Sequence, residues 1–224
     1  MRLLDLCCGI GGASVGYAAA GYDVTGVDIN HQPDYPYSFV HGDALEYVKA
    51  HGHEYDLIHT SWPCPAYSLV TRGTLRGKTS HPRLIEPGRE ALNETGVPWV
   101  MENVMSAPLR ADLWLCGDMF PGKLEVIRHR KFELSHGLSV PQPVHTRHRG
   151  LVTQYRHGVW QEGPYVRVSG HSERGSTLAD VQRAMNIYWT DNRSQIVQAI
   201  PAEYTRYIGT SVAAQLAMER CASA

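Results

Sequence analysis

The stretch Leu3-Leu4-Asp5-Leu6-Cys7-Cys8-Gly9-Ile10-Gly11-Gly12 decides the expected fold, because it joins a short apolar run to a turn rich in glycine. Its first part, Leu3–Cys7, predicts a buried β-strand, and the small residues of Ala13–Ala20 predict the helix after the turn. Glycines in such a turn let the backbone approach a ligand closely and leave helix N-terminal N–H groups to bind it. The stretch therefore predicts the first strand, ligand-binding turn and helix of an α/β domain.

Strand and helix patterns continue to alternate along the N-terminal half. Strands are expected at Asp23–Asp28, Tyr55–Thr60 and Pro98–Glu102, and a helix at Ala44–His51, which Phe39–Val40 and Gly42-Asp43 precede. This alternation predicts a parallel, doubly wound sheet that binds its ligands at the carboxyl ends of its strands.

Four reactive side chains fall at these carboxyl ends, namely Asp28, Asp43, Cys64 and Glu102. Cys64 lies in a Pro-Cys-Pro turn, whose stiff backbone would present a nucleophile, although a plain turn with a small buried thiol has the same pattern. Asp28 would hold the ribose hydroxyls of an adenosyl ligand. Asp43 could accept a hydrogen bond from the adenine amino group, or it could be the N-cap of the next helix.

The glycine turn departs from the dinucleotide fingerprint G-x-G-x-x-G, which requires a glycine where this chain has Ser14. This departure disfavours a nucleotide-binding oxidoreductase. A short turn with an acid at the end of the next strand suits an adenosyl ligand without a pyrophosphate.

The chain is expected to have three parts. Residues 1–125 would form a cofactor-binding and catalytic core, residues 126–172 a loop-rich excursion from the sheet, and residues 173–224 a return to the core through helices around Thr177–Asn186 and from Pro201 through Ala217. The core carries 9 Lys and Arg against 15 Asp and Glu, whereas the excursion carries 7 against 2. Its excess of arginine over lysine is typical of sites that bind phosphates or base edges, although a solvated basic loop would look the same.

Cysteine usage and hydropathy argue against several classes of protein. The 5 cysteines are odd in number and form no Cys-x-x-Cys pair, which disfavours a disulfide framework and favours a reducing cytoplasm. We expect no metal, because His145 and His148 have no cysteine or acid near them in the sequence. No run approaches membrane-spanning length, and Asp5 interrupts any signal-peptide core, so we expect a cytoplasmic protein without membrane contact.

Five motifs follow one another along the chain: Gly9-Ile10-Gly11-Gly12, Pro63-Cys64, Glu102-Asn103-Val104, Arg128-His129-Arg130 and Ile200-Pro201-x-x-Tyr204-x-x-x-Ile208-Gly209. In this order they resemble the DNA (cytosine-5) methyltransferases, with the spacing of the small enzymes of phages and prophages. The resemblance implies a Rossmann-like methyltransferase sheet, S-adenosylmethionine as methyl donor, and a cytosine flipped out of DNA as acceptor.

The resemblance also implies a role for each matching residue. Cys64 would be the nucleophile that adds to C6 of cytosine, Glu102 the acid at N3, and Arg130 with Arg128 the groups that steady the base. The cofactor would be bound by Asp5, Cys7, Gly9, Ile10, Gly11, Gly12, Asp28, Ile29, Asp43, Pro63, Thr210 and Ser211.

The chain departs from the family pattern at several positions. Trp62 and Pro65 alter the wall around the base, Cys7 and Ile29 replace aromatic residues near the cofactor, and Thr210 replaces an asparagine. None of these changes removes a catalytic group, so they bear on the form of the substrate more than on the reaction.

The basic excursion would be a minimal target-recognition region, in which Arg147, Arg149 and Arg156 are expected to contact DNA. The part available to read a sequence, residues 135–173, is small against a typical specific DNA footprint. A free cytosine nucleotide or RNA therefore remains open as the substrate, and so does an inactive relative that only binds DNA.

Overall fold

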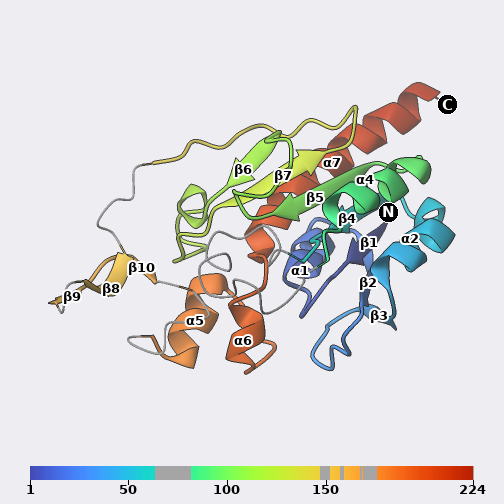
Figure 1. Ribbon diagram of the computed structural model, residues 1–224. Helices are drawn as coiled ribbons and strands as arrows, with labels where there is room; N and C mark the ends of the chain where they lie inside the picture. Colours follow the sequence, from blue (N-terminus) through green and yellow to red (C-terminus); the bar gives the residue numbers. More distant parts are fainter. Residues whose placement is uncertain (64–81, 147–151, 157–158, 167, 169–175, 224) are drawn as a thin grey trace.

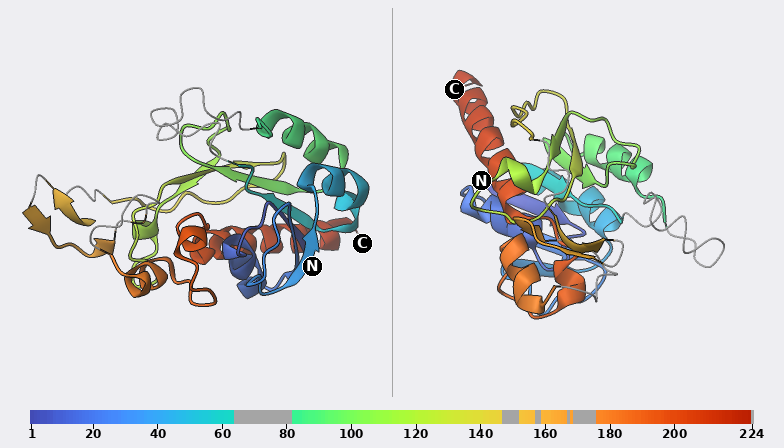
Figure 2. Two further views of the ribbon diagram at one scale, coloured as in Figure 1. Left: turned by 60° about the horizontal axis from the view of Figure 1, so that its bottom comes forward. Right: turned by 90° about the vertical axis from the view of Figure 1, so that its left-hand side faces the viewer.

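The computed structural model describes residues 1–63, 82–146, 152–156, 159–166, 168 and 176–223. Its centre is a seven-stranded sheet of order β3-β2-β1-β4-β5-β7-β6 with helices on both faces (Figures 1 and 2). The strands are β1 Arg2–Leu6, β2 Asp23–Asp28, β3 Ser38–His41, β4 Leu57–Thr60, β5 Trp99–Asn103, β6 Leu113–Leu115 and β7 Arg130–Leu134.

The first five strands run parallel, and β7 lies antiparallel between β5 and β6. The predicted doubly wound sheet is confirmed. Its strand order reverses at β1 and β4, because the chain first builds outward from β1 to β3 and then returns to the other side. Ligands of such sheets bind at this reversal, beside the carboxyl ends of the strands.

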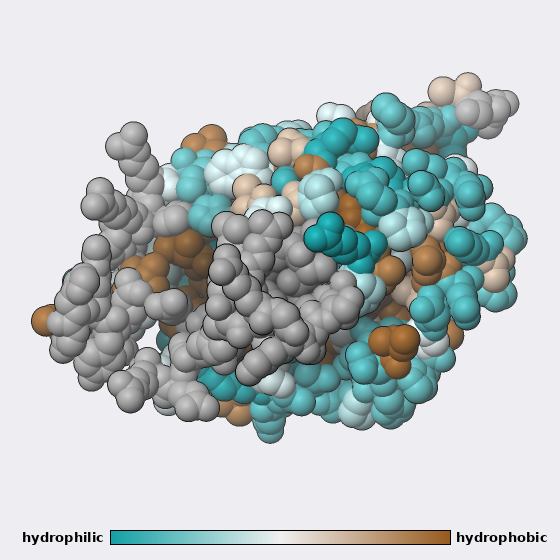
Figure 3. Space-filling model, in the orientation of Figure 1, coloured by the Kyte–Doolittle hydropathy of each residue, from teal (hydrophilic) through white to brown (hydrophobic). Residues whose placement is uncertain are grey.

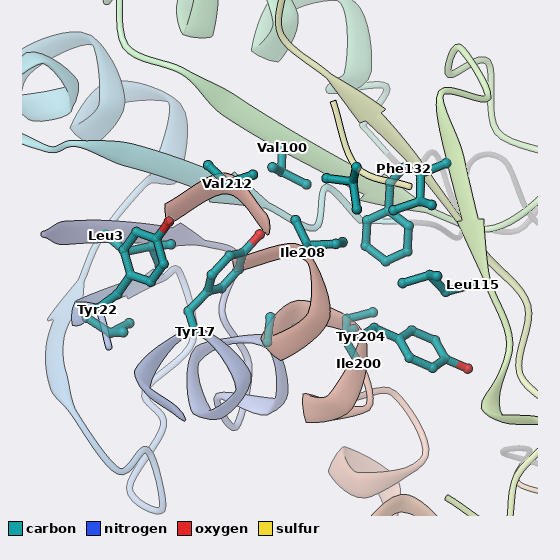
Figure 4. Close-up of a cluster of buried hydrophobic side chains, with 14 of the residues drawn as sticks. Leu3, Tyr17, Tyr22, Val100, Leu115, Phe132, Ile200, Tyr204, Ile208 and Val212 are labelled. Carbon is teal, nitrogen blue, oxygen red and sulfur yellow. The ribbon is translucent and has the colours of Figure 1, made fainter. Parts of the chain in front are cut away.

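Two pairs of helices bury the two faces of the sheet. One face is covered by α1 (Gly12–Ala19) and α7 (Ala202–Ser223), and the other by α2 (Ala44–His51) and α4 (Ile85–Glu94). Successive residues of a strand point to opposite faces, so Leu3 joins the first core and Leu4 the second. Figure 4 shows the first core, where Leu3 and Val100 of the sheet face Tyr17 of α1 and helix α7.

The close approach of α1 and α7 fixes the position of the glycine turn. A Cβ atom at Gly16 of α1 would lie 2.0 Å from the carbonyl oxygen of Ala202, so only glycine fits there. The hydroxyl of Thr205 on α7 donates a hydrogen bond to the carbonyl oxygen of Ala13, at 2.7 Å. Both contacts lie in the first turns of α1, immediately after the glycine turn.

The remaining described elements are shorter. Two 3-10 helices, η1 and η2, and two α-helices, α5 and α6, connect the larger elements, and their bounds are Gly52–Glu54, Gly117–Met119, Leu178–Met185 and Arg193–Ile196. A small sheet of order β10-β8-β9 lies apart from the main sheet (Figures 1 and 2), with bounds Tyr165–Val166, Val152–Arg156 and Val159–Gln161. The segment 126–172, expected to leave the sheet, thus first contributes β7 to it and departs only after Leu134.

The described surface is polar over most of the face drawn in Figure 3. None of the helices in the described ranges combines the length and the apolar character needed to cross a membrane.

Candidate active site

The adjacent strands β1, β4 and β5 bring three predicted motifs to one edge of the sheet. Leu6 at the end of β1 lies beside Thr60 of β4, and Thr60 lies beside Met101 of β5. The glycine turn follows β1, Glu102 is the next residue of β5, and the chain after β4 leads to Pro63. Cys64 itself lies outside the described residues, but the segment that leads to it ends at this edge.

Glu102 is a buried carboxyl group paired with an arginine. Its side chain is 6% exposed, and Oε1 lies 2.9 Å from Nε of Arg130. The antiparallel register places Phe132 opposite Glu102, so Arg130 is the diagonal neighbour of Glu102 on the same face of the sheet. Two residues predicted separately for the site are thus in contact, and their roles stay predictions.

Burial is the largest influence on the pKa of Glu102 and raises it. Arg130, Arg128 and a hydrogen bond from Ser61 act in the opposite direction without cancelling the effect of burial. Glu102 can therefore hold a proton at a higher pH than an ordinary glutamate does. This is the property that the proposed acid at N3 of cytosine requires.

Two contacts hold Arg128, one with the segment that precedes α7 and one with the first turn of α7. Its guanidinium donates to the carbonyl oxygen of Gln198 at 3.3 Å, and its own carbonyl oxygen accepts from the Tyr204 hydroxyl at 2.6 Å. Tyr204 belongs to the last of the five sequence motifs. That motif therefore helps to position Arg128, which its sequence alone did not indicate.

Asn103 fixes the chain that leads to Cys64. Its side-chain amide donates to the carbonyl oxygen of Trp62 at 2.8 Å, and its side-chain oxygen accepts from the backbone N–H of Val104 at 2.9 Å. The Trp62 indole is buried against α4, where a Cβ atom at Gly88 would lie 2.4 Å from it. Asn103 and Trp62 thus hold the backbone two residues before Cys64.

A chain of buried hydrogen bonds runs from the core to Glu102. The Tyr17 hydroxyl lies 3.1 Å from Nδ1 of His59, and Nε2 of His59 lies 3.1 Å from Oγ of Ser61, which bonds Glu102 in turn. Burial lowers the pKa of His59 to about 3, so its imidazole is neutral. These three residues were not predicted, because each lies in or near an apolar strand or helix and matches no motif.

The glycine turn has a left-handed backbone at three positions. Gly9 and Gly11 have φ of 52° and 85°, and Cys7, which carries a side chain, also has a positive φ of 56°. No described heavy atom lies within 4 Å of a Cβ atom built at Gly9, so there is open space beside the turn. The N–H of Gly9 donates to Oδ2 of Asp28 at 3.0 Å, which joins the turn to the end of β2.

Asp5 lies directly beneath the turn. Oδ2 accepts a hydrogen bond from the Ser14 hydroxyl, which lies 2.7 Å from the Tyr35 hydroxyl, while Oδ1 has no hydrogen-bond partner among the described residues. Burial, aided by the charges of Asp28 and Glu102, raises the pKa of Asp5 to about 7. Ser14, which breaks the dinucleotide fingerprint, is therefore the residue that bonds this carboxyl group.

Two other predicted cofactor residues, Asp43 and Ile29, form no hydrogen bond with the glycine turn in the described part of the chain. Asp43 is the N-cap of α2 and accepts from the backbone N–H groups of Leu45 and Glu46 at 2.8 and 3.0 Å, which is the alternative that its position allowed. Ile29 follows Asp28 and is 65% exposed. A role for either residue in binding the cofactor stays a prediction.

Thr210 and Ser211 do not lie with the glycine turn. Both belong to the continuous helix α7, and their hydroxyls bond the carbonyl oxygens one turn earlier in that helix. The preceding Gly209 packs against Tyr17 and Ala20, at the far end of α1, about 12 Å along the helix from Gly12.

The basic residues expected to contact DNA are mostly outside the described part. Arg147 and Arg149 lie beyond it, and Arg156 is the last residue of β8, where only the backbone is described.

Solved structures resemble the chain over nearly its whole length, whereas no family model and no curated protein sequence matches it. A protein of E. coli, described as a DNA modification methyltransferase encoded within a prophage, has a TM-score of 0.63 and 14% identity over 97% of this chain and 99% of its own. The chain shares this methyltransferase fold. A mutant of DNMT2 from Spodoptera frugiperda has a TM-score of 0.58 and 12% identity over 96% and 99% of the two chains. The methyltransferase EhMeth of Entamoeba histolytica has 0.56 and 11% over 98% of each.

Proposed function

We propose that this chain is a methyltransferase that transfers a methyl group from S-adenosylmethionine to C5 of cytosine in DNA, with Cys64 as a covalent nucleophile. The observation that carries the proposal is the buried Glu102, paired with Arg130 beside Arg128, at the sheet edge toward which the Cys64 segment leads. The glycine turn, which follows the neighbouring strand β1, lies at the same edge. A methyl donor and its acceptor could therefore bind side by side.

The chemistry needs these groups because C5 of cytosine is a weak nucleophile. Addition of the Cys64 thiolate to C6 breaks the C5–C6 double bond and makes C5 electron-rich. Glu102, in its protonated form, donates to N3 so that negative charge does not build up on the ring. C5 is then methylated, a base removes the C5 proton, and the electron pair of that bond re-forms the double bond as the Cys64 thiolate leaves.

Arg130 and Arg128 adjust the pKa of Glu102. Their charges lower the pKa that burial raises, so the carboxyl group can both hold and give up a proton. Arginine also offers several N–H donors in a plane, which suits a planar base with a carbonyl oxygen. The base has to leave the double helix to be reached by these groups and by Cys64.

The residues of the glycine turn fit an adenosyl cofactor. Open space lies where a side chain at Gly9 would be, Asp28 stands at the end of the next strand, and Asp5 offers a buried carboxyl oxygen without a described partner. When bound there, S-adenosylmethionine would supply the methyl group. Asp28 would bind ribose hydroxyls, and the turn would allow the backbone to approach the ligand closely.

The preference for DNA rests on the basic stretch at residues 126–172, since the catalytic half of the chain is acidic. A single nucleotide would need few positive charges, whereas a DNA backbone presents one phosphate after another. The free nucleotide and RNA are the alternatives that the experiment has to separate.

Expression in a host without cytosine methylation tests the proposal. We expect wild type to leave 5-methylcytosine at a short recurring sequence in the genomic DNA, and Cys64→Ala to leave none. The matched control is Cys221→Ala, which removes an exposed cysteine near the end of α7 and should methylate as wild type does. Unmethylated DNA together with transfer to dCMP or RNA by the purified protein would overturn the DNA assignment, and no transfer to any cytosine would overturn the proposed reaction.

A further inference from the structure

Three side chains that commonly bind metals converge beside β6 and β7. They are Cys116, His129 and His145, called here the Cys–His cluster, and their ligand atoms all lie within 4.8 Å of one another. They come from three separate parts of the chain, so no spacing pattern in the sequence reveals them. The expectation that His145 has no cysteine partner holds along the sequence but does not hold in space.

Each member of the cluster is positioned by the fold. Cys116 is buried and directly follows β6, at the N-cap of η2. His129 directly precedes β7, which is the antiparallel neighbour of β6. The ring of Trp114 on β6 lies 5.8 Å from that of His129 and 4.8 Å from that of His145, measured between centroids, so it supports both imidazoles.

Asp118 supplies a fourth group. Its Oδ1 lies 3.4 Å from Nε2 of His145, and its side chain has no exposed surface. Its other oxygen, Oδ2, accepts from the backbone N–H of Thr146 at 3.2 Å and from the Thr146 hydroxyl at 3.0 Å. The carboxylate is therefore held so that Oδ1 faces the cluster.

We propose that the Cys–His cluster binds a zinc ion, with Asp118 as the fourth ligand. Thiolate, imidazole and carboxylate are the groups that bind Zn²⁺ in proteins, usually four of them in a tetrahedron. Bond lengths of about 2.0–2.3 Å correspond to ligand atoms about 3.3–3.7 Å apart. The ligand atoms of Cys116, His129 and His145, which lie up to 4.8 Å apart, would therefore have to move about 1 Å closer together, and Asp118 lies beside them through its 3.4 Å distance from His145. Cys116 would bind as the thiolate and release its proton to solvent.

The site would be structural, because four protein ligands leave no open position for substrate. It would join the end of β6, the start of β7 and the segment at 145–146 that leads toward residues 152–166. His129 lies between Arg128 and Arg130, so the metal would also hold the backbone that carries both arginines. Metal binding does not depend on the proposed methyl transfer, and it can be measured without it.

The full chain, purified after expression in zinc-supplemented medium and dialysed, would be analysed for metal by mass spectrometry. We expect one zinc per chain in wild type and a loss of bound zinc in His145→Ala and Cys116→Ser. Asp118→Asn, which removes the negative charge of the proposed fourth ligand, should bind Zn²⁺ more weakly than wild type. His136→Ala, which changes an exposed histidine, and Cys221→Ser are the matched controls and should keep their zinc.

Replacement of zinc by Co²⁺ identifies the ligands by colour. Wild type and Cys64→Ala should both show the intense visible bands of tetrahedral Co²⁺ and a thiolate-to-cobalt charge-transfer band, whereas Cys116→Ser should lose the charge-transfer band. If Cys116→Ser does not fold, as judged by circular dichroism, His145→Ala decides through its lost visible bands. The proposal is wrong if wild type binds no zinc, if His145→Ala binds as much as wild type, or if the charge-transfer band disappears with Cys64 instead.

Discussion

Replacement of Glu102 by glutamine isolates the acid at the centre of the proposed site. The change keeps the size of a side chain that is only 6% exposed and lies 2.9 Å from Arg130, but it removes the proton that the carboxyl group can hold. A positioned acid contributes about 10²–10⁴-fold in rate. We therefore expect Glu102→Gln to raise the barrier of the chemical step by about 2.8–5.6 kcal/mol, at about 1.4 kcal/mol for each factor of ten.

Single-turnover transfer of a labelled methyl group measures this step, and calorimetry measures the affinity for S-adenosylmethionine. The rate should fall while the affinity stays unchanged, because Asp28 and the glycine turn lie on other strands. Glu133→Gln is the matched control, since Glu133 is also buried on the sheet and ion-paired, to Arg89 at 2.8 Å, but on β7 away from the glycine turn. A wild-type rate in Glu102→Gln would refute the acid role, and a matching loss of cofactor affinity would place Glu102 in the cofactor pocket.

Stability adds an independent test of the same residue. Because burial raises the pKa of Glu102 in the folded protein, the folded state binds more protons than the unfolded state above the usual glutamate pKa of 4.5. The free energy of unfolding that this group contributes is therefore present at low pH. It falls as the pH rises from the pKa of Glu102 in the unfolded state to its raised pKa in the folded state, by up to about 1.4 kcal/mol per pH unit. Relative to Glu102→Gln, wild type should lose free energy of unfolding on going from pH 4 to pH 7 in denaturant titrations.

Three further changes probe the cofactor and DNA contacts. Asp28→Ala should weaken S-adenosylmethionine binding in calorimetry with little effect on the single-turnover rate at saturating cofactor, and an unchanged affinity would remove Asp28 from that site. Because burial raises the pKa of Asp5 to about 7, the free energy of unfolding of wild type should fall by up to about 4 kcal/mol between pH 4 and pH 7. Asp5→Asn should abolish this fall, and an equal dependence of unfolding free energy on pH in both proteins would contradict the prediction. Arg147→Ala, Arg149→Ala and Arg156→Ala should each lower the slope of log affinity against log salt for duplex DNA by about 1, and three unchanged slopes would exclude phosphate contacts.

Local patterns were sufficient to predict the elements around the cofactor turn. Asp23–Asp28 and Ala44–His51 have the predicted bounds, because an alternating strand and an N-capped amphipathic helix are defined by their own residues. Helix α4 was not predicted, since Pro87 and Gly88 disfavour helix in general, although proline is tolerated in the first turn that Pro87 occupies. Strand β7 alternates charged and apolar residues irregularly, and only its pairing with β5 and β6 makes it part of the sheet.

Motifs in the sequence were sufficient to select some residues of the candidate site. Glu102 and Arg130 were each assigned to the site from a motif, and the structure brings them into contact, while their roles stay predictions. The supporting residues were not predictable, because His59 and Ser61 act through contacts across strands that no local pattern encodes. The same reason explains the Cys–His cluster, whose members meet only when β6 and β7 pair.

Covalent trapping tests the role of Cys64 most directly. In DNA that contains 5-fluorocytosine, C5 carries a fluorine that cannot leave as a proton, so the adduct formed after methyl transfer cannot resolve. With labelled S-adenosylmethionine, wild type should give a protein–DNA complex that survives denaturation and carries the labelled methyl group, and Cys64→Ala should give none. A denaturation-resistant methylated complex with Cys64→Ala, or methylation of ordinary cytosine by that variant, would contradict covalent catalysis by Cys64.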